Sequence, residues 1–378
     1  MTQSIPLKES AMNRARVESL AGDLSRVAAG FDADGFIATV MDRLPRLELK
    51  SRIACVADAL ASYLPTDVGA ATKILIAALP PHDDATFTGS DFGLYTYAPY
   101  SDWIARYGCT RENLDTSLDA LKEMTKHFTA EDALRYFLNA YPDETMKAVS
   151  QWSRDPDYHV RRLVSEGTRP KLPWSSRITL PIDAAIPVLD ELFADSSRFV
   201  TQSVANHLND ITTIDPELAL ATLGRWRAAN RQRPKEMEFL IRQSLRTLIK
   251  KGHPGAFEFL GLSTTPLVEV ITLRLDATEV AIGDGLGIDC TLRATGTTTE
   301  HLVIDYVLAY PRARGSHAEA VFKGTTLTLA PGESRTVSRT QPLRSTSGRK
   351  LGPGTGRLHI QVNGRRVAEA AFELLPSR

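Results

Sequence analysis

An internal repeat with a period of forty residues is the feature that most constrains the fold of this chain. The segment DPDYHVRRLVSEG (155–167) recurs as DSSRFVTQSVANH (195–207), and in both copies an aspartate comes first and valines follow at an i, i+4 spacing. That spacing places the valines on one face of a helix. Periods near forty residues are typical of HEAT and armadillo repeats, in which helix pairs bury their apolar faces against neighbouring pairs. The repeat therefore predicts a stacked helical array whose function lies on its concave surface.

The composition is that of a soluble globular protein. Apolar residues make up 43% and charged residues 24% of the 378 positions, a length that favours roughly two domains. The 45 basic and 45 acidic residues cancel, so the net charge neither favours nor excludes a polyanionic partner. The cysteines Cys55, Cys109 and Cys290 lie far apart without metal-ligand spacing, and we therefore expect neither a disulfide nor a zinc site. We further expect the protein to act without a metal or a cofactor.

The N-terminus, MTQSIPLKES, has no basic end followed by an apolar run. No stretch of the chain approaches the about 18 consecutive apolar residues that a membrane-spanning helix requires. We therefore expect a monomeric cytoplasmic protein without a membrane partner.

The periodicity of the apolar residues changes along the chain. Up to about residue 260 it is helical, and prolines separate the successive helical stripes. Beyond residue 265 the period is two, in seven segments divided by turn residues, and Asn363-Gly364 is a strong hairpin signal. We predict a mainly α protein with HEAT-like repeats at 1–262, followed by an all-β immunoglobulin-like sandwich at 267–378.

Two segments interrupt the helical pattern. Segment 81–103 contains six aromatic residues, which either pack onto the repeat core or form a surface that stacks on bases. These residues are Phe87, Phe92, Tyr95, Tyr97, Tyr100 and Trp103. Segment 168–181 contains three prolines, which exclude a continuous helix, and it presents Trp174.

Two polar strings stand at equivalent ends of adjacent repeats, VSEGTRPKLPW at 164–174 and SVANHLND at 203–210. Together they bring carboxylates, an arginine and an indole to one rim of the array. Structural roles are the alternative for these residues. The amides and His207 of the second string are suited to caps and hydrogen bonds between repeats, and Glu166 and Asp210 to ion pairs with neighbouring arginine residues.

These strings resemble those of the AlkC-type DNA glycosylases, HEAT-like-repeat enzymes related to AlkD that remove alkylated bases. The resemblance extends to WIARYG at 103–108, to LRTLIKKGHP at 245–254 and to the C-terminal tail, and so covers nearly the whole chain. It implies a bacterial DNA repair enzyme that carries an immunoglobulin-like domain after its repeats and associates with the nucleoid when bound to DNA. The sequence departs from the family at Thr201-Gln202, which stands where a basic pair commonly sits.

The resemblance also implies an active site and a reaction. Its carboxylates correspond to Glu131, Glu166 and Asp210, its base-side aromatic residue to Trp174, and its flanking basic residues to Arg162 and Arg169. A base methylated at N3, as in 3-methyladenine or 3-methylcytosine, is cationic and leaves without a general acid. Carboxylates then stabilise the oxocarbenium-like transition state and orient water, while an indole attracts the cation by roughly 0.5 to 2 kcal/mol. The implied enzyme is a monofunctional base-excision glycosylase that acts without deep base flipping.

Basic residues on the inner helices are expected to hold the phosphates of double-stranded DNA without reading its sequence. They are Arg162, Arg169, Arg242, Arg246 and Lys250. In the sandwich, a second basic group either clamps the DNA backbone or is simply solvated. Its members are Arg312, Arg314, Lys323, Arg349 and Lys350. Two other functions remain open, a non-catalytic HEAT scaffold that grips DNA or a protein, and a peptide-binding solenoid with an adhesion-like sandwich.

Overall fold

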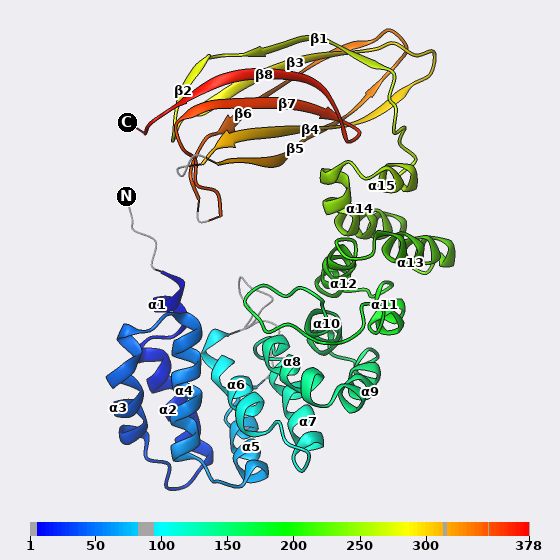
Figure 1. Cartoon of the computed structure of the whole chain (residues 1–378). Helices are drawn as coiled ribbons and strands as arrows, with labels where there is room; N and C mark the ends of the chain where they lie inside the picture. Colours follow the sequence, from blue (N-terminus) through cyan, green and yellow to red (C-terminus); the bar gives the residue numbers. More distant parts are fainter. Residues whose placement is uncertain (1–5, 82–93, 313–315, 347, 378) are drawn as a thin grey trace. The chain divides into compact units, whose positions relative to one another are not determined.

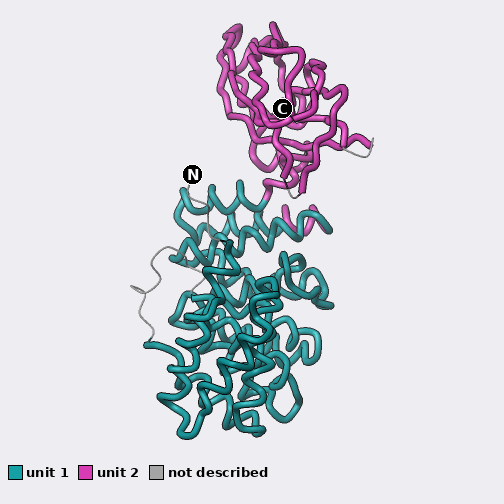
Figure 2. The backbone as a smooth tube through the Cα atoms, turned by 90° about the vertical axis from the view of Figure 1, so that its left-hand side faces the viewer, with its two compact units in different colours: residues 1–214, 221–244 teal, residues 215–220, 245–378 magenta. Residues whose placement is uncertain are grey.

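The computed structural model describes residues 6–81, 94–312, 316–346 and 348–377. These residues form a helical array followed by a β-sandwich, so the predicted fold class is confirmed (Figure 1). The chain divides into two compact units, residues 1–214 with 221–244 and residues 215–220 with 245–378 (Figure 2). This division precedes the boundary predicted between residues 262 and 267, because the last turns of the array belong to the same compact unit as the sandwich.

The helices of the array have the following bounds: α1 (Leu7–Ala11), α2 (Arg14–Val27), α3 (Ala33–Arg43), α4 (Leu49–Tyr63), α5 (Val68–Ala77), α6 (Ala98–Tyr107), α7 (Leu114–Met124), α8 (Glu131–Ala140), α9 (Pro142–Trp152), α10 (Tyr158–Gly167), α11 (Ile186–Leu192), α12 (Arg198–Ile211), α13 (Pro216–Ala229), α14 (Pro234–Lys251) and α15 (Pro254–Phe259). Short 3-10 helices are η1 (Leu44–Arg46) and η3 (Tyr95–Tyr97).

In the helical unit, α4, α6, α8, α10 and α12 pack against one another in this order and form one layer. Helices α5, α7, α9 and α11 belong to the other layer (Figure 1). The two copies of the sequence repeat are α10 and α12, and their valines at 160, 164, 200 and 204 are fully buried. The i, i+4 valine pattern therefore marks the faces that hold neighbouring repeats together.

The aspartates that precede α10 and α12 link each repeat to the one before it. Asp155 and Asp195 both accept a hydrogen bond from the backbone N–H two residues further on, at 2.9 and 2.8 Å. Asp155 also pairs with Lys122 of α7 at 2.8 Å, and Asp195 pairs with Arg161 of α10 at 2.5 Å. Because both carboxylates are buried, these pairs fix the register between successive repeats.

Within segment 81–103, residues 95–97 form η3 and residues 98–103 belong to α6. Phe87 and Phe92 lie outside the described residues. Tyr97, Tyr100 and Trp103 are buried, so they pack onto the repeat core and the alternative of a base-stacking surface is wrong for these three residues. The physical reason is that Tyr100 and Trp103 lie on the buried face of the amphipathic helix α6, and Tyr97 directly precedes this helix.

The strands of the sandwich are β1 (Val268–Leu275), β2 (Glu279–Ala281), β3 (Gly285–Ala294), β4 (Glu300–Pro311), β5 (His317–Leu329), β6 (Ser334–Pro342), β7 (Gly354–Val362) and β8 (Arg365–Leu375). They form a three-stranded sheet in the order β1-β3-β6 and a five-stranded sheet in the order β2-β8-β7-β4-β5. Sequence analysis missed β2, because three residues are too short to display an alternating pattern. This strand pairs with β8 in parallel.

The core of the sandwich lies between its two sheets and contains Leu286, Ile288, Leu302, Leu358 and Ile360. Side chains of β3 alternate between this core and the surface, as the period of two predicts. The hairpin predicted at Asn363-Gly364 is present between β7 and β8, with φ angles of +43° and +81°. Two successive positive φ angles are what the favoured two-residue hairpin turn requires.

This hairpin packs against the residues that follow α14. A Cβ atom on Gly364 would lie 2.4 Å from the Cα atom of Gly252, so the two glycine backbones are in direct contact. The Asn363 side chain donates a hydrogen bond to the carbonyl oxygen of Ser263 at 2.9 Å. Residues 245–260 therefore belong to the same compact unit as the sandwich.

Candidate active site

Three carboxylates lie at the ends of three successive helices of one layer. Glu131 is the first residue of α8, while Glu166 and Asp210 are the next-to-last residues of α10 and α12. The helix dipole favours a negative charge at the start of a helix and disfavours one at its end. Glu166 and Asp210 therefore require cationic partners, and the sequence supplies them nearby.

Arg169 joins Glu166 to Asp210. Its Nη1 atom lies 2.6 Å from Oε1 of Glu166, and its Nε and Nη2 atoms lie 2.8 and 3.3 Å from the two carboxylate oxygens of Asp210. The three residues are only 6 to 8% exposed. Charge-assisted and bidentate hydrogen bonds of this kind hold both carboxylates in defined orientations.

Arg162 extends the cluster from Glu166 to Glu131. Its guanidinium nitrogens lie 3.7 Å from Glu166 Oε2 and 3.4 Å from Glu131 Oε2. It also donates to the hydroxyl of Thr129 and lies over the ring of Phe199, 4.7 Å from the centroid. The structure thus brings together five of the charged residues that the sequence marked: Glu131, Arg162, Glu166, Arg169 and Asp210. The alternative role for Glu166 and Asp210, ion pairing with neighbouring arginine residues, is confirmed.

The surroundings of the three carboxylates shift their pKa values in different directions. Burial raises the pKa of Glu131 and of Asp210, and the adjacent guanidinium groups oppose this effect only in part. Burial acts on Glu166 in the same sense, but Arg162, Arg169 and the Ser203 hydroxyl outweigh it and leave its pKa below the usual value. Glu166 is therefore the carboxylate most firmly held as an anion.

Polar residues of α12 form hydrogen bonds with Glu166 and with the neighbouring helices α10 and α14. The hydroxyl of Ser203 donates to Glu166 Oε2 at 2.6 Å, a contact that the sequence analysis did not anticipate. His207 Nδ1 lies 3.0 Å from the carbonyl oxygen of Ser165, and burial lowers the pKa of His207 to about 4. Asn206 accepts a hydrogen bond from Gln243 of α14 at 3.2 Å. His207 and Asn206 thus have the inter-repeat role that was the alternative for them.

Trp174 stands out in the segment between α10 and α11. The residue is 88% exposed to solvent. Its backbone has a φ angle of +70°, which is unusual for a residue with a bulky side chain. Its carbonyl oxygen accepts a hydrogen bond from Lys50 of α4, and Lys50 pairs with Asp132 of α8 at 2.8 Å. The indole is therefore presented to solvent by a backbone that is tied to the array.

The basic residues expected to hold phosphates fall into two groups. Arg162 and Arg169 are 5 and 8% exposed and contact carboxylates, so their charge serves the cluster in this structure. Arg242, Arg246 and Lys250 follow one another at intervals of four along α14 and so lie on one face of that helix. Arg242 is exposed and pairs with Glu238 of the same helix at 2.8 Å.

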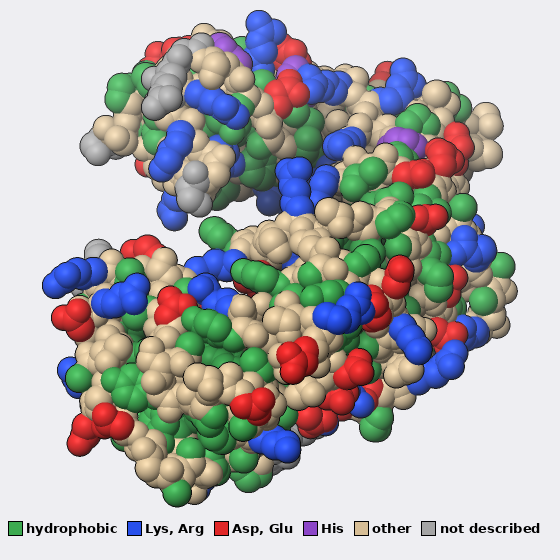
Figure 3. Space-filling view, turned by 60° about the horizontal axis from the view of Figure 1, so that its bottom comes forward, with side chains coloured by type: hydrophobic (Ala, Val, Ile, Leu, Met, Phe, Trp, Pro, Cys, Tyr) green, Lys and Arg blue, Asp and Glu red, His purple; other side chains and the backbone are tan. Residues whose placement is uncertain are grey.

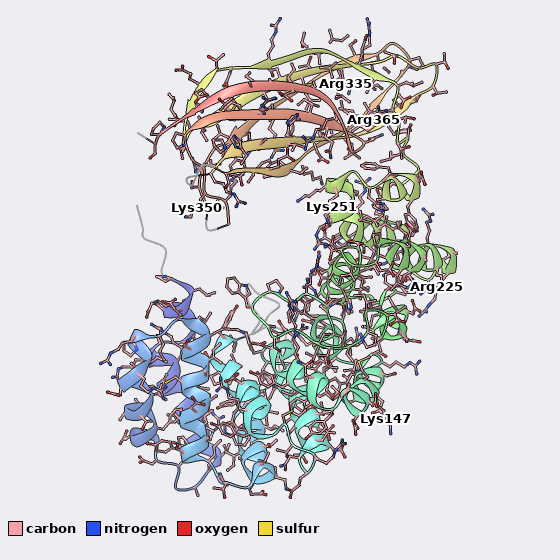
Figure 4. The ribbon with its side chains drawn as sticks, in the orientation of Figure 1. Lys147, Arg225, Lys251, Arg335, Lys350 and Arg365 are labelled. Atoms are coloured by element: carbon pink, nitrogen blue, oxygen red, sulfur yellow. The ribbon has the colours of Figure 1, made fainter. Side chains whose placement is uncertain are left out.

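In the sandwich, Arg312, Lys323 and Lys350 are exposed, and Arg314 lies outside the described residues. Arg349 lies over the ring of Phe322, 5.0 Å from its centroid. Lys350 belongs to the loop between β6 and β7 (Figure 4). Acidic and basic side chains are interspersed over the face of the helical unit that Figure 3 shows.

In the described part of the chain, no helix is both long and apolar enough to span a bilayer. Within those same residues, no group of three or more histidine, cysteine, aspartate or glutamate side chains is arranged to hold a metal ion.

Comparison with known proteins yields a solved structure that matches almost the entire chain. It is the alkylpurine DNA glycosylase AlkC of Pseudomonas fluorescens bound to DNA containing an abasic site analogue, with 34% identity and a TM-score of 0.88 over 98% of this chain and 99% of that one. The Bacillus subtilis protein YhaZ is 29% identical over 88% of this chain and 90% of its own length. The family model for the C-terminal immunoglobulin-like domain of YhaZ matches residues 269–376.

The fold and the cluster define a helical-repeat protein with a buried group of carboxylates and guanidinium groups and a C-terminal immunoglobulin-like domain. With the similarity extending over both parts, the chain belongs to the AlkC family.

Proposed function

We propose that this protein is a monofunctional DNA glycosylase that hydrolyses the N-glycosidic bond of cationic N3-alkylated bases in double-stranded DNA. The description of its AlkC relative as an alkylpurine DNA glycosylase supports this activity. One observation carries the proposal: Glu166 and Asp210 converge on Arg169, next in sequence to a segment that exposes Trp174. 3-Methyladenine is the proposed substrate, and 3-methylcytosine is a second one of the same charge type.

A substrate that already carries a positive charge removes the need for a general acid. As the bond to the base lengthens, positive charge moves onto the deoxyribose, and fixed carboxylates stabilise that charge without having to reorganise. Glu166, whose pKa is lowered, is suited to this electrostatic role. Arg162 and Arg169 form ion pairs with Glu166, and these pairs keep it ionised and oriented.

Asp210 is suited to act on the attacking water. A general base works best when its pKa lies close to the working pH, and burial moves the pKa of Asp210 upward from the usual aspartate value. Environments that push the pKa values of two neighbouring carboxylates apart give them different roles. We therefore assign transition-state stabilisation to Glu166, and orientation and deprotonation of water to Asp210. Glu131 is assigned an indirect role, because it pairs with Arg162, which in turn contacts Glu166.

Trp174 would contact the cationic base or sugar through the face of its indole, an attraction of roughly 0.5 to 2 kcal/mol that a neutral base lacks. Lysine chemistry is not required, because water cleaves the bond. Lys171, which lies closest to the site in sequence, donates to the hydroxyl of Thr213 at 2.5 Å. We therefore expect base release without strand cleavage. Arg242, Arg246 and Lys250 are proposed to contact phosphates without reading the base sequence. We further propose that the bond is cleaved without deep base flipping.

The experiment that tests this function is base release from methylated duplex DNA, with the freed bases identified by chromatography. We expect the wild-type protein to release N3-methylated bases, and Glu166→Gln and Asp210→Asn to lose on the order of 10² to 10³ in rate while still binding DNA. Asp195→Asn is the matched control, because Asp195 is also buried and paired with an arginine but supports the register of the repeats. A non-catalytic scaffold, the alternative, would bind DNA and release no base in any variant.

A further inference from the structure

The segment that presents Trp174 has little structure of its own. Residues 168–185 contain neither helix nor strand. The one backbone hydrogen bond within residues 170–180 runs from the Ser175 N–H to the Leu172 carbonyl at 3.3 Å, among the described residues. Contacts from outside the segment must therefore hold its shape, and most of the side-chain hydrogen bonds to its backbone come from α8.

Arg135 of α8 makes the largest number of these contacts. Its Nη1 atom donates to the carbonyl oxygens of Gly167 and Arg169, at 3.1 and 2.8 Å, and its Nε atom donates to the carbonyl oxygen of Ser176. The residue is 1% exposed. One rigid guanidinium group thus holds both ends of the turn that carries Trp174.

A second side chain of α8 extends this support by one helical turn. The Asn139 amide donates to the carbonyl oxygen of Arg177 at 2.9 Å and accepts a hydrogen bond from the Thr179 N–H at 3.1 Å. Residues four apart on a helix lie on the same face, so Arg135 and Asn139 form one polar stripe directed at the segment. Lys50 adds a contact to the Trp174 carbonyl from α4.

We infer that Arg135 is a positioning residue that places the Trp174 indole and the Arg169 guanidinium for base release. This inference rests on the glycosylase function proposed above. Arg135 reaches no carboxylate of the cluster by a hydrogen bond within the described residues; it acts through the backbone of Gly167, Arg169 and Ser176. A planar fork with several fixed donors can satisfy three carbonyl groups at once, whereas the single ammonium group of lysine cannot do so in the same geometry.

The test compares Arg135→Lys with a matched control, Arg52→Lys. Arg52 is likewise buried at 2% exposure and donates to the carbonyl oxygens of Leu47, Lys8 and Met12, but it supports the N-terminal helices. Both variants keep the charge and are expected to lower the melting temperature. Only Arg135→Lys is expected to slow single-turnover base release at saturating DNA, on the order of 10²-fold, since small misplacements of catalytic groups cost about that much. Its affinity for DNA should change little.

A spectroscopic measurement follows the segment itself. Of the four tryptophans in the chain, Trp174 is exposed, whereas Trp103, Trp152 and Trp226 are 2 to 5% exposed. Faster local motion of Trp174 is expected to appear in the decay of tryptophan fluorescence anisotropy of Arg135→Lys, and to be absent from Arg52→Lys and from the Trp174→Phe form of each variant.

The outcomes separate the positioning role from the function. Unchanged base release and unchanged anisotropy in Arg135→Lys, or an equal loss of activity in Arg52→Lys, would overturn the positioning role. If the wild-type protein releases no methylated base, the proposed function fails, and the anisotropy measurement still decides whether Arg135 holds the Trp174 segment.

Discussion

Replacement of Arg169 by methionine tests whether one guanidinium group neutralises two buried carboxylates. Arg169 contacts Glu166 at 2.6 Å and Asp210 at 2.8 and 3.3 Å. After this substitution, Glu166 would still have its contacts with the Ser203 hydroxyl at 2.6 Å and with Arg162 at 3.7 Å. Asp210 keeps no ion-pair partner among the described residues, so most of the cost falls on this carboxylate.

Removal of one partner from a buried ion pair costs about 3 to 5 kcal/mol. We expect Arg169→Met to lower the free energy of unfolding of the helical unit by that amount at pH 7.5. Without Arg169, the pKa of the folded Asp210 carboxyl rises further above its value in the unfolded chain. The unpaired Asp210 carboxylate then destabilises the protein most at pH values above the pKa of Asp210 in the folded state. The effect falls as the pH drops and vanishes below the pKa of Asp210 in the unfolded chain, where the carboxyl is protonated in both states. The loss should therefore be smaller at pH 5 than at pH 7.5.

The assay is urea unfolding followed by circular dichroism at 222 nm, at both pH values. The double variant Arg169→Met with Asp210→Asn removes the unpaired charge and should recover much of the stability at pH 7.5. The reasoning is refuted if the single variant loses the same free energy at both pH values, or if the second substitution recovers nothing.

Two further predictions concern the site and the sandwich. Ser203→Ala removes a hydrogen bond that favours ionised Glu166, so the pKa of Glu166 should rise. The acidic limb of the pH profile of base release should therefore move to higher pH. Superimposable pH profiles for the variant and the wild-type protein would contradict this. Gly364→Ala places a Cβ 2.4 Å from Gly252 Cα at a positive φ, and should destabilise the second unit by about 2 to 5 kcal/mol in urea unfolding. Gly332→Ala is the control, because Gly332 also has a positive φ but has open space around the Cβ position. This variant should lose only the part of the unfolding free energy that comes from backbone strain.

Local patterns in the sequence predicted the helical array and the sandwich that follows it, but not the short strand β2. The valines of the repeat predict the faces of α10 and α12 because helical periodicity is visible within a few residues. Asn363-Gly364 predicts the last hairpin because a two-residue turn has its own conformational demands. The family strings around Glu166 and Asp210 likewise occupy short stretches, which is why the candidate site residues could be named before their geometry was known.

Only the tertiary structure decided how those residues are connected. Arg169 and Asp210 are 41 residues apart, and Lys50 and the Trp174 carbonyl are 124 residues apart, so no local pattern reveals that they meet. The role of Arg135 was hidden for the same reason, since its partners are backbone carbonyl groups, which every residue carries. Helix packing determines which distant groups become neighbours. Burial then raises the pKa values of Glu131 and Asp210, whereas Arg162, Arg169 and the Ser203 hydroxyl outweigh burial at Glu166 and lower its pKa.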